Sequence, residues 1–183
     1  MKMDLNKWFD KGLTPEEYMD SLEYHKDNFM HVYNHFTMPD DEDKLAAIKE
    51  KNLRVVALAE VWCGHCMLCV PILLRLAEKT GMPVKILPRD ENLELMDQYL
   101  TNEKRIIPIF VFIDEDGNEI AKWGPMSETT RAYVDNLKKD LPPKDAEDYK
   151  EKFKEFAKTT SKEFTENKDI QKGTYDSIVN SLV

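Results

Sequence analysis

Apolar residues change their spacing twice along the chain, and the changes divide it into three segments. In residues 1–52, apolar side chains recur every three or four positions, as they do on one face of a helix. In residues 53–141, short continuous apolar runs alternate with stretches of helical spacing, which indicates buried strands connected by helices. The helical spacing returns in residues 142–183. The pattern predicts a central α/β domain with a helical extension on each side, the second one packed on the core.

The first extension contains a clear helix start signal. Thr14 stands at the N-cap position, Pro15 at the first helical position, and Glu17 completes a capping box. Apolar residues then recur at helical spacing from Tyr18 to Phe36, which predicts one long helix. We interpret the aromatic side chains of this helix as part of the core.

The central segment predicts a four-stranded mixed sheet flanked by helices. Four runs have the length and composition of strands: residues 53–60, 83–87, 106–113 and 119–123. Helices are expected over residues 66–80 and 90–100, and again after Ser127. The first two strands should be parallel because a helix connects them. The last two should form a hairpin, because a turn with Gly117 connects them.

The clearest chemical signal directly follows the first predicted strand. There the sequence reads Trp62-Cys63-Gly64-His65-Cys66 and continues into helical spacing. The N–H groups and the dipole of a helix start favour a thiolate. A thiolate is the nucleophile in thiol–disulfide exchange. The motif therefore predicts redox chemistry of a cysteine pair.

Charge and hydropathy narrow the possible partners and location. The chain has 26 basic and 35 acidic residues, a net charge of −9, which argues against nucleic acid or an anionic membrane as the main partner. No apolar run approaches the roughly 18–20 residues of a membrane span, and residues 1–10 lack the apolar stretch of a signal peptide. We therefore expect a cytoplasmic protein, in which a close cysteine pair is more often catalytic or metal-binding than structural.

Together these features resemble the thioredoxin fold. The predicted order is strand, helix, strand, helix, strand, strand, helix, with the cysteine motif after the first strand. Four more features stand where that family has them: Pro71 inside the motif helix, Ile107-Pro108 at the third strand, Gly117 in the hairpin turn and Gly124 after the last strand. This resemblance covers about half of the chain closely. With helical extensions at both ends, the whole chain resembles a group of largely uncharacterised thioredoxin-like proteins of Gram-positive bacteria.

The resemblance implies a thiol–disulfide oxidoreductase that needs no cofactor. Cys63 would be the attacking thiolate and Cys66 the resolving thiol that releases the substrate from the mixed disulfide. His65, if protonated, would stabilise the Cys63 thiolate and lower its pKa; the other interpretation of His65 is a solvated turn residue. Cys-Gly-His-Cys resembles the motif of protein disulfide isomerase more than that of thioredoxin, which favours an oxidising site.

The resemblance also implies where a substrate would bind. Trp62 would be a partly exposed lid beside the sulfurs, unless its role is packing alone. In the family the peptide before Pro108 is cis, which would leave the N–H and C=O of Ile107 free to pair with an extended substrate. Gly64 and Gly124 would border the same site. Substrates would be disulfide-containing proteins or low-molecular-weight thiols, with an unidentified reductant.

Two positions depart from the family pattern. Ala57 stands where thioredoxins carry a buried acid, and the nearest acid is Glu60. Glu60 is either the proton acceptor for Cys66 or an exposed charge at the end of the strand. Cys69, three residues after Cys66, is either a small buried apolar residue or a second resolving thiol.

Two other functions remain open on the sequence alone. Cys63, Cys66 and Cys69 have part of a ferredoxin spacing, with His65 nearby, but the fourth cysteine of such a run is missing. Zinc ligands usually come as two separated pairs, so we expect no metal. The remaining alternative is a thioredoxin-fold binding module without turnover. The sequence does not indicate an oligomeric state.

Overall fold

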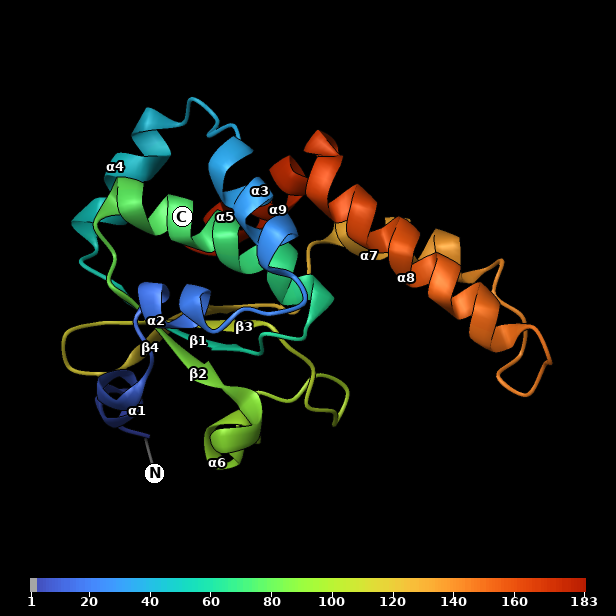
Figure 1. Cartoon of the computed structure of the whole chain (residues 1–183). Coiled ribbons are helices and arrows are strands. Elements are labelled where there is room, and N and C mark those ends of the chain that lie inside the picture. The colour runs from blue at the N-terminus through green and yellow to red at the C-terminus, as the bar shows by residue number, and fades with distance from the viewer. Residues whose placement is uncertain (1–2) are drawn as a thin grey trace.

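A mixed four-stranded sheet forms the centre of the computed structural model, which describes residues 3–183 (Figure 1). Its strands are β1 (Arg54–Ala59), β2 (Val84–Pro88), β3 (Ile109–Ile113) and β4 (Glu119–Trp123), in the order β2-β1-β3-β4. β1 is parallel to β2 and antiparallel to β3, and β3 is antiparallel to β4. The predicted α/β class, with a mixed sheet and extra helices at both ends, is confirmed.

β1 and helix α5 (Gly64–Thr80) bring the cysteine motif to one edge of the sheet. Every residue of β1 after Arg54 is fully buried, as expected of a continuous apolar strand covered on both faces. α5 contains Pro71 and ends at Gly81, whose φ of 73° lies in the left-handed region that glycine adopts without strain. The predicted strand, motif helix and glycine stop are therefore confirmed.

Two shorter helices replace the long helix predicted in the first extension, and a further helix lies on each side of them. They are α1 (Leu5–Lys11), α2 (Pro15–Asp20), α3 (Lys26–His35) and α4 (Glu42–Glu50). The single long helix predicted from Tyr18 to Phe36 is wrong, because α2 contacts β2 whereas α3 packs on α5. A straight helix would not reach both surfaces. The capping box of Thr14 and Glu17 is confirmed, and the apolar stripe is buried as predicted.

The connection after β2 also differs from its prediction. Instead of one helix over residues 90–100, a 3-10 turn η1 (Arg89–Glu91) precedes a short helix α6 (Leu93–Met96). Asp90 does not cap a helix, because its carboxylate binds the guanidinium of Arg89; Asn92 is the N-cap of α6. Leu100 lies outside the helix and is exposed.

The second extension lies along the motif helix. Its helices are α8 (Tyr149–Glu166) and α9 (Lys168–Asn180), and α7 (Glu128–Lys138) ends the central segment before it. Ser127 caps α7 as predicted. α9 begins at Lys168, because Asn167 accepts hydrogen bonds from two backbone N–H groups of its first turn. α9 packs on α5 and on α7, whereas the first half of α8 projects from the body as an arm (Figure 1).

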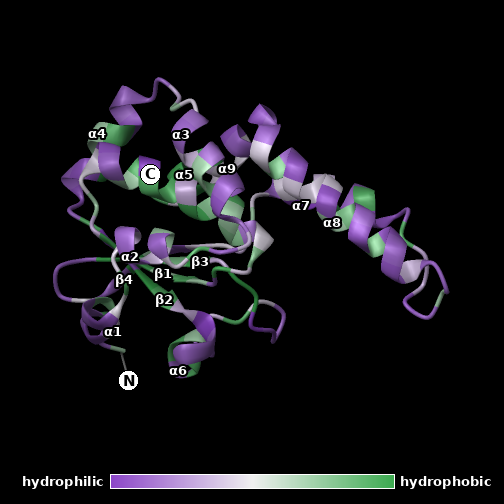
Figure 2. Ribbon diagram, in the orientation of Figure 1, coloured by the Kyte–Doolittle hydropathy of each residue, from purple (hydrophilic) through white to green (hydrophobic). Residues whose placement is uncertain are grey.

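One connected apolar core includes residues from all three segments of the sequence. Figure 2 shows hydrophobic residues concentrated in the central strands and α5, and hydrophilic residues along the outer helices. The division into segments 1–52, 53–141 and 142–183 stays a prediction, and residues 1 and 2 lie outside the described part. Within residues 3–183, no helix is both long and apolar enough to cross a lipid bilayer.

Candidate active site

The cysteine motif lies where β1 ends and α5 begins. Cys63 is the N-cap residue of α5, and its Sγ accepts a hydrogen bond from the N–H of Cys66 at 3.3 Å. Cys66 lies one turn further into the helix and is fully buried, whereas Cys63 retains 8% of its surface exposed. Both thiols, and that of Cys69, are free. The helix start thus places the thiol of Cys63 nearer the protein surface than the thiol of Cys66.

The two thiols of the motif have opposite pKa shifts. A hydrogen bond from the Cys66 thiol lowers the pKa of Cys63, against the effect of burial. The N–H groups of Cys66 and His65 and the positive charge of Arg89 lower it further. Burial raises the pKa of Cys66 well above its ordinary value. The site can therefore hold a thiolate at Cys63 beside a protonated thiol at Cys66.

The turn before β3 lies against the shallow thiol. The Sγ of Cys63 is 3.8 Å from the carbonyl oxygen of Ile107. The peptide bond between Ile107 and Pro108 is cis, as the resemblance implied, and so is the bond between Gly124 and Pro125. Within residues 3–183, the N–H of Ile107 has no hydrogen-bond partner. A backbone donor and acceptor therefore stand beside the reactive sulfur.

Gly124 completes this side of the site at the end of β4. Its φ is 130°, and a Cβ added there would lie 2.2 Å from the carbonyl oxygen of Pro108. Only glycine permits this close approach. By contrast, a Cβ added to Gly64 would meet nothing within 4 Å, so Gly64 leaves open space beside the motif.

The indole of Trp62 lies at the surface of the site under a cation. Trp62 is 46% exposed, and the guanidinium carbon of Arg89 lies 4.8 Å from the centre of its ring. Sequence reasoning missed Arg89. A signal was present, because parallel strands end at the same edge of a sheet. Arg89 directly follows β2, and the register pairs Ala59 of β1 with Pro88.

The surroundings of His65 disfavour its expected role as a cation. Burial, with the charges of Lys138 and Arg131, lowers the pKa of His65 to about 4, so the imidazole is neutral near pH 7. Its ring packs against Phe164 of α8, with ring centres 5.3 Å apart. Within the described residues, its buried Nδ1 has no hydrogen-bond partner. No local sequence pattern indicated this burial, because Phe164 lies almost one hundred residues further along the chain.

The carboxylate of Glu60 holds the backbone at Asp90, and the Glu60 backbone also makes a hydrogen bond with the Cys66 thiol. Its Oε1 accepts a hydrogen bond from the N–H of Asp90 at 3.0 Å. Its carbonyl oxygen accepts from the hydroxyl of Tyr18 at 3.1 Å and from the N–H of Cys63 at 3.3 Å. Burial raises the pKa of the Glu60 carboxyl. Tyr18, interpreted from sequence as core alone, therefore also anchors the residue from which the motif loop starts.

Cys69 is fully buried. Its Sγ lies 4.0 Å from the carbonyl oxygen of Pro125, at the limit of a thiol hydrogen bond. Burial raises its pKa well above the ordinary value. These features favour the interpretation as a small apolar residue. In the part of the chain that the structure describes, no group of three or more His, Cys, Asp or Glu side chains is placed to hold a metal ion.

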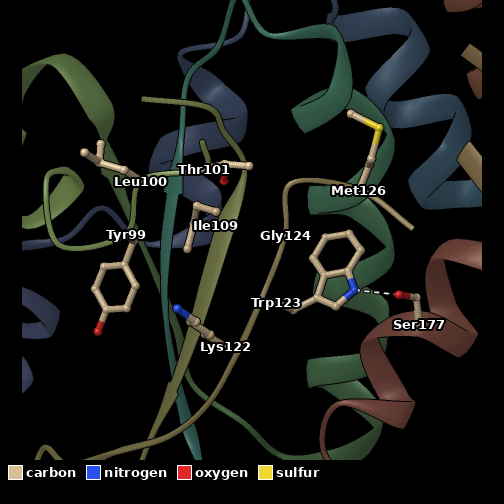
Figure 3. Close-up of a pocket in the computed structure, with 9 residues that line it drawn as sticks. All are labelled: Tyr99, Leu100, Thr101, Ile109, Lys122, Trp123, Gly124, Met126 and Ser177. Carbon is tan, nitrogen blue, oxygen red and sulfur yellow. Dashed lines mark hydrogen bonds between the residues drawn. The ribbon is translucent and has the colours of Figure 1, made fainter. Parts of the chain in front are cut away.

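A surface cavity borders the Gly124 side of the site (Figure 3). Its volume is about 290 Å³. Ile109 of β3, Trp123 of β4 and Met126 contribute apolar atoms to its lining, and Ser177 of α9 accepts a hydrogen bond from the Trp123 indole at 2.8 Å. The second extension therefore contributes to a surface beside the dithiol, which the sequence did not reveal.

Known proteins resemble the chain in sequence and in fold. The sequence model of a family described as thioredoxin matches residues 12–138. The chain is similar to a protein of unknown function from Pseudomonas aeruginosa, with a TM-score of 0.63 and 13% identity over 89% of this chain and 95% of that one. It is also similar to an HIV epitope-scaffold, with a TM-score of 0.69 and 14% identity over 97% and 96%.

A thioredoxin of Fasciola hepatica is 28% identical over 51% of this chain and 88% of its own, with a TM-score of 0.35. No curated protein matches the chain. The two structures with TM-scores above 0.6 share its fold over most of its length.

Proposed function

The chain belongs to the thioredoxin family, and from this premise we propose that it is a thiol–disulfide oxidoreductase. The observation that carries the proposal is the asymmetry of its dithiol. Cys63 is shallow and its pKa is lowered, whereas Cys66 is fully buried and its pKa is raised. A thiolate attacks a disulfide and a thiol does not, so this asymmetry gives the two cysteines different roles.

In the proposed reaction, two electrons pass from the dithiol to a substrate disulfide. The Cys63 thiolate attacks one substrate sulfur, the substrate S–S bond breaks, and the other substrate sulfur leaves as a thiolate. Cys66 then loses its proton and attacks Cys63 in the mixed disulfide. The Cys63–Cys66 bond forms, and the second substrate sulfur leaves and takes up a proton. An external dithiol reductant reverses the change at the protein.

The backbone of Ile107 supports a polypeptide disulfide as substrate. Its carbonyl oxygen lies 3.8 Å from the Cys63 Sγ, and its N–H has no partner among residues 3–183. An extended segment beside the substrate cysteine would pair with both groups, as a strand added to a sheet edge does. The cavity next to Gly124 gives room for a side chain of that segment.

The physiological partners and the direction of exchange remain predictions. We propose a disulfide-containing protein or a low-molecular-weight thiol as substrate and an intracellular reductant, in a cytoplasmic setting. The oxidising character expected from the Cys-Gly-His-Cys motif stays a prediction, and the lowered pKa of His65 removes a protonated imidazole as its cause. The likeness to thioredoxin-like proteins of Gram-positive bacteria also stays a prediction.

Trapping mixed disulfides tests the proposed reaction. A Cys66→Ser variant lacks the resolving thiol, so we expect it to accumulate covalent complexes through Cys63 in cells and with a peptide disulfide in vitro. Non-reducing electrophoresis and mass spectrometry would identify the cysteine that is linked. The matched control is Cys69→Ser, which removes a buried thiol outside the exchange and should trap nothing.

Turnover is the second measurement. The wild type should reduce a peptide disulfide in the presence of a dithiol reductant, and Cys63→Ser should abolish this reduction. A wild type that turns over neither peptide nor low-molecular-weight disulfides would contradict the proposal and favour a binding module.

A further inference from the structure

Arg89 connects three separate pieces of the site, and the proposed reaction assigns it no role. Its guanidinium carbon lies 4.8 Å from the ring centre of Trp62, in the motif loop. Its Nη1 donates to the carbonyl oxygen of Arg105 at 3.0 Å, in the loop that leads to Ile107. Its Nε donates to Oδ1 of Asp90 at 3.0 Å. One planar group thus joins the motif, η1 and the loop before Pro108.

This group is held more firmly than an ordinary surface arginine. Its side chain is only 22% exposed, although it follows the last residue of an edge strand. Arginine suits this position because its planar guanidinium stacks on an aromatic ring and still donates several hydrogen bonds in fixed directions. Lysine carries the same charge but does not provide this geometry.

The positive charge of Arg89 also favours the Cys63 thiolate, with a smaller effect than the hydrogen bonds to that sulfur, and the carboxylate of Asp90 at 3.0 Å partly offsets it. The titratable side chains that interact with Cys63 are Cys66 and Cys69 of α5, Tyr18 of α2, and Arg89 of η1. In the described part of the chain, Arg89 is the only basic side chain among them. It also lies close enough to Glu60 to favour the charged form of that carboxyl. The imidazole of His65, expected to supply the positive charge, is neutral near pH 7 and packs on Phe164.

We propose that Arg89 is a positioning residue of the dithiol site, which holds Trp62 and the loop before Pro108 together and provides the positive charge beside Cys63. The inference rests on the proposed function for its effect on substrates. Its two parts are separable, because charge acts on the sulfur and the bridge acts on the substrate-facing backbone. A substrate strand that pairs with Ile107 needs that loop at a fixed distance from Cys63, and the bond to the Arg105 carbonyl fixes it.

Three variants separate the effect of the Arg89 charge from the effect of its contacts with Trp62 and the loop before Pro108. Arg89→Gln removes the charge, Arg89→Lys keeps the charge but loses the planar bridge, and Arg105→Gln is the matched control. The Arg105 side chain pairs with Asp97 at the surface, with both groups about half exposed, so its loss removes a nearby guanidinium outside the site. Thermal unfolding of all three would show that each variant is folded before its kinetics are compared.

The first readout is the rate of Cys63 alkylation by iodoacetamide against pH, which requires no turnover. Arg89→Gln should raise the midpoint of this profile by about half a pH unit or more, as expected when a partly screened cation is lost. Arg89→Lys and Arg105→Gln should leave the midpoint within about a tenth of a pH unit of the wild-type midpoint. An unchanged midpoint in Arg89→Gln, or an equal shift in Arg105→Gln, would overturn the charge role.

The second readout is the steady-state reduction of a peptide disulfide. Arg89→Lys should raise KM by about threefold to tenfold, the effect of losing a hydrogen bond and a stacking contact, with a smaller change in kcat. Reduction of a small disulfide without a peptide chain should be nearly unaffected. Equal losses for both substrates would overturn the bridging role. If the wild type reduces neither substrate but the alkylation midpoint still shifts, the proposed function fails and the charge role is supported.

Discussion

At the scale of single residues, depth in the helix distinguishes the two thiols of the motif. Cys63 at the N-cap keeps some exposure and receives hydrogen bonds, whereas Cys66 is surrounded by protein. Each N–H that points at the Cys63 sulfur stabilises its thiolate. The identity of the side chain at residue 65 therefore matters less for the thiolate than the backbone of that residue.

Two substitutions of His65 separate its ring from its backbone. His65→Ala keeps the N–H that faces the Cys63 sulfur and removes an imidazole that is neutral near pH 7, so the Cys63 alkylation profile should hardly move. His65→Pro removes that N–H and should raise the pKa of Cys63 and lower the reduction potential. Equilibration against glutathione would measure the potentials. A shift as large in His65→Ala as in His65→Pro would show that the ring carries the effect.

Burial of His65 also makes the stability of the protein depend on pH. The folded pKa of about 4 lies below the ordinary value of 6.5, so between these values the unfolded chain binds a proton that the folded chain does not. The free energy of unfolding should therefore fall as the pH drops from about 6.5 to about 4. The full effect is on the order of 3 kcal/mol, since each pKa unit corresponds to about 1.4 kcal/mol.

A His65→Leu variant provides the comparison, because it keeps an apolar contact with Phe164 and cannot titrate. Denaturant unfolding of both proteins at several pH values would give the difference in stability. The stability of the variant relative to the wild type should increase as the pH falls. Parallel curves would contradict the buried neutral imidazole, because every carboxylate is common to both proteins.

At the scale of elements, the predictions succeeded where local signals decide the structure. The glycine stop of α5, the capping box of α2 and the cap of α7 are all confirmed, because each depends on residues a few positions apart. The helix predicted over residues 18–36 failed because its two halves pack on different partners. For the same reason the motif residues were predictable. The common edge of the parallel strands β1 and β2 indicated that Arg89 lies near the motif, whereas the contact of His65 with Phe164 had no local signal.

Two glycines at element ends should respond differently to the same substitution. At Gly81 a Cβ meets nothing within 4 Å, so Gly81→Ala should cost about 1 kcal/mol of stability from its left-handed φ and leave activity unchanged. At Gly124 a Cβ would lie 2.2 Å from a backbone oxygen, so the loop must move away from Pro108. Gly124→Ala should therefore lower kcat/KM for a peptide disulfide by about tenfold or more.

Disulfide reduction and thermal unfolding of both variants would test this pair. Gly81→Ala serves as the control for the conformational cost of alanine at a positive φ. Normal activity in Gly124→Ala would contradict the close approach of this loop to Pro108 as a requirement for substrate docking.

At the scale of the whole molecule, the second extension is part of the core. The family model matches residues 12–138, but α9 packs on α5 with Tyr175, Ile178 and Val179 buried. Phe164 of α8 is buried against His65. Covering this apolar surface is worth several kcal/mol, since a buried large side chain contributes about 1.5–3 kcal/mol.

A chain that ends at residue 141 should therefore not fold stably, although it contains the whole predicted thioredoxin-like segment. We expect it to bind a hydrophobic dye and to lack a cooperative thermal transition. The control is Phe153→Ser in the full chain, which changes an aromatic residue of the arm that is 45% exposed and should cost little. A cooperative transition near the wild-type temperature in the shortened chain would show that the extension is dispensable for folding.

The packing of α9 on α5 also affects how the protein is made. α9 is translated after every other described element, and about one hundred residues separate the end of α5 from the end of α9. At about 5–20 residues per second, the ribosome needs seconds to supply it. During that time the nascent chain carries the cysteine pair on a helix whose outer face is still uncovered. Other cellular thiols and chaperones can therefore meet Cys63 and Cys66 before the finished protein exists.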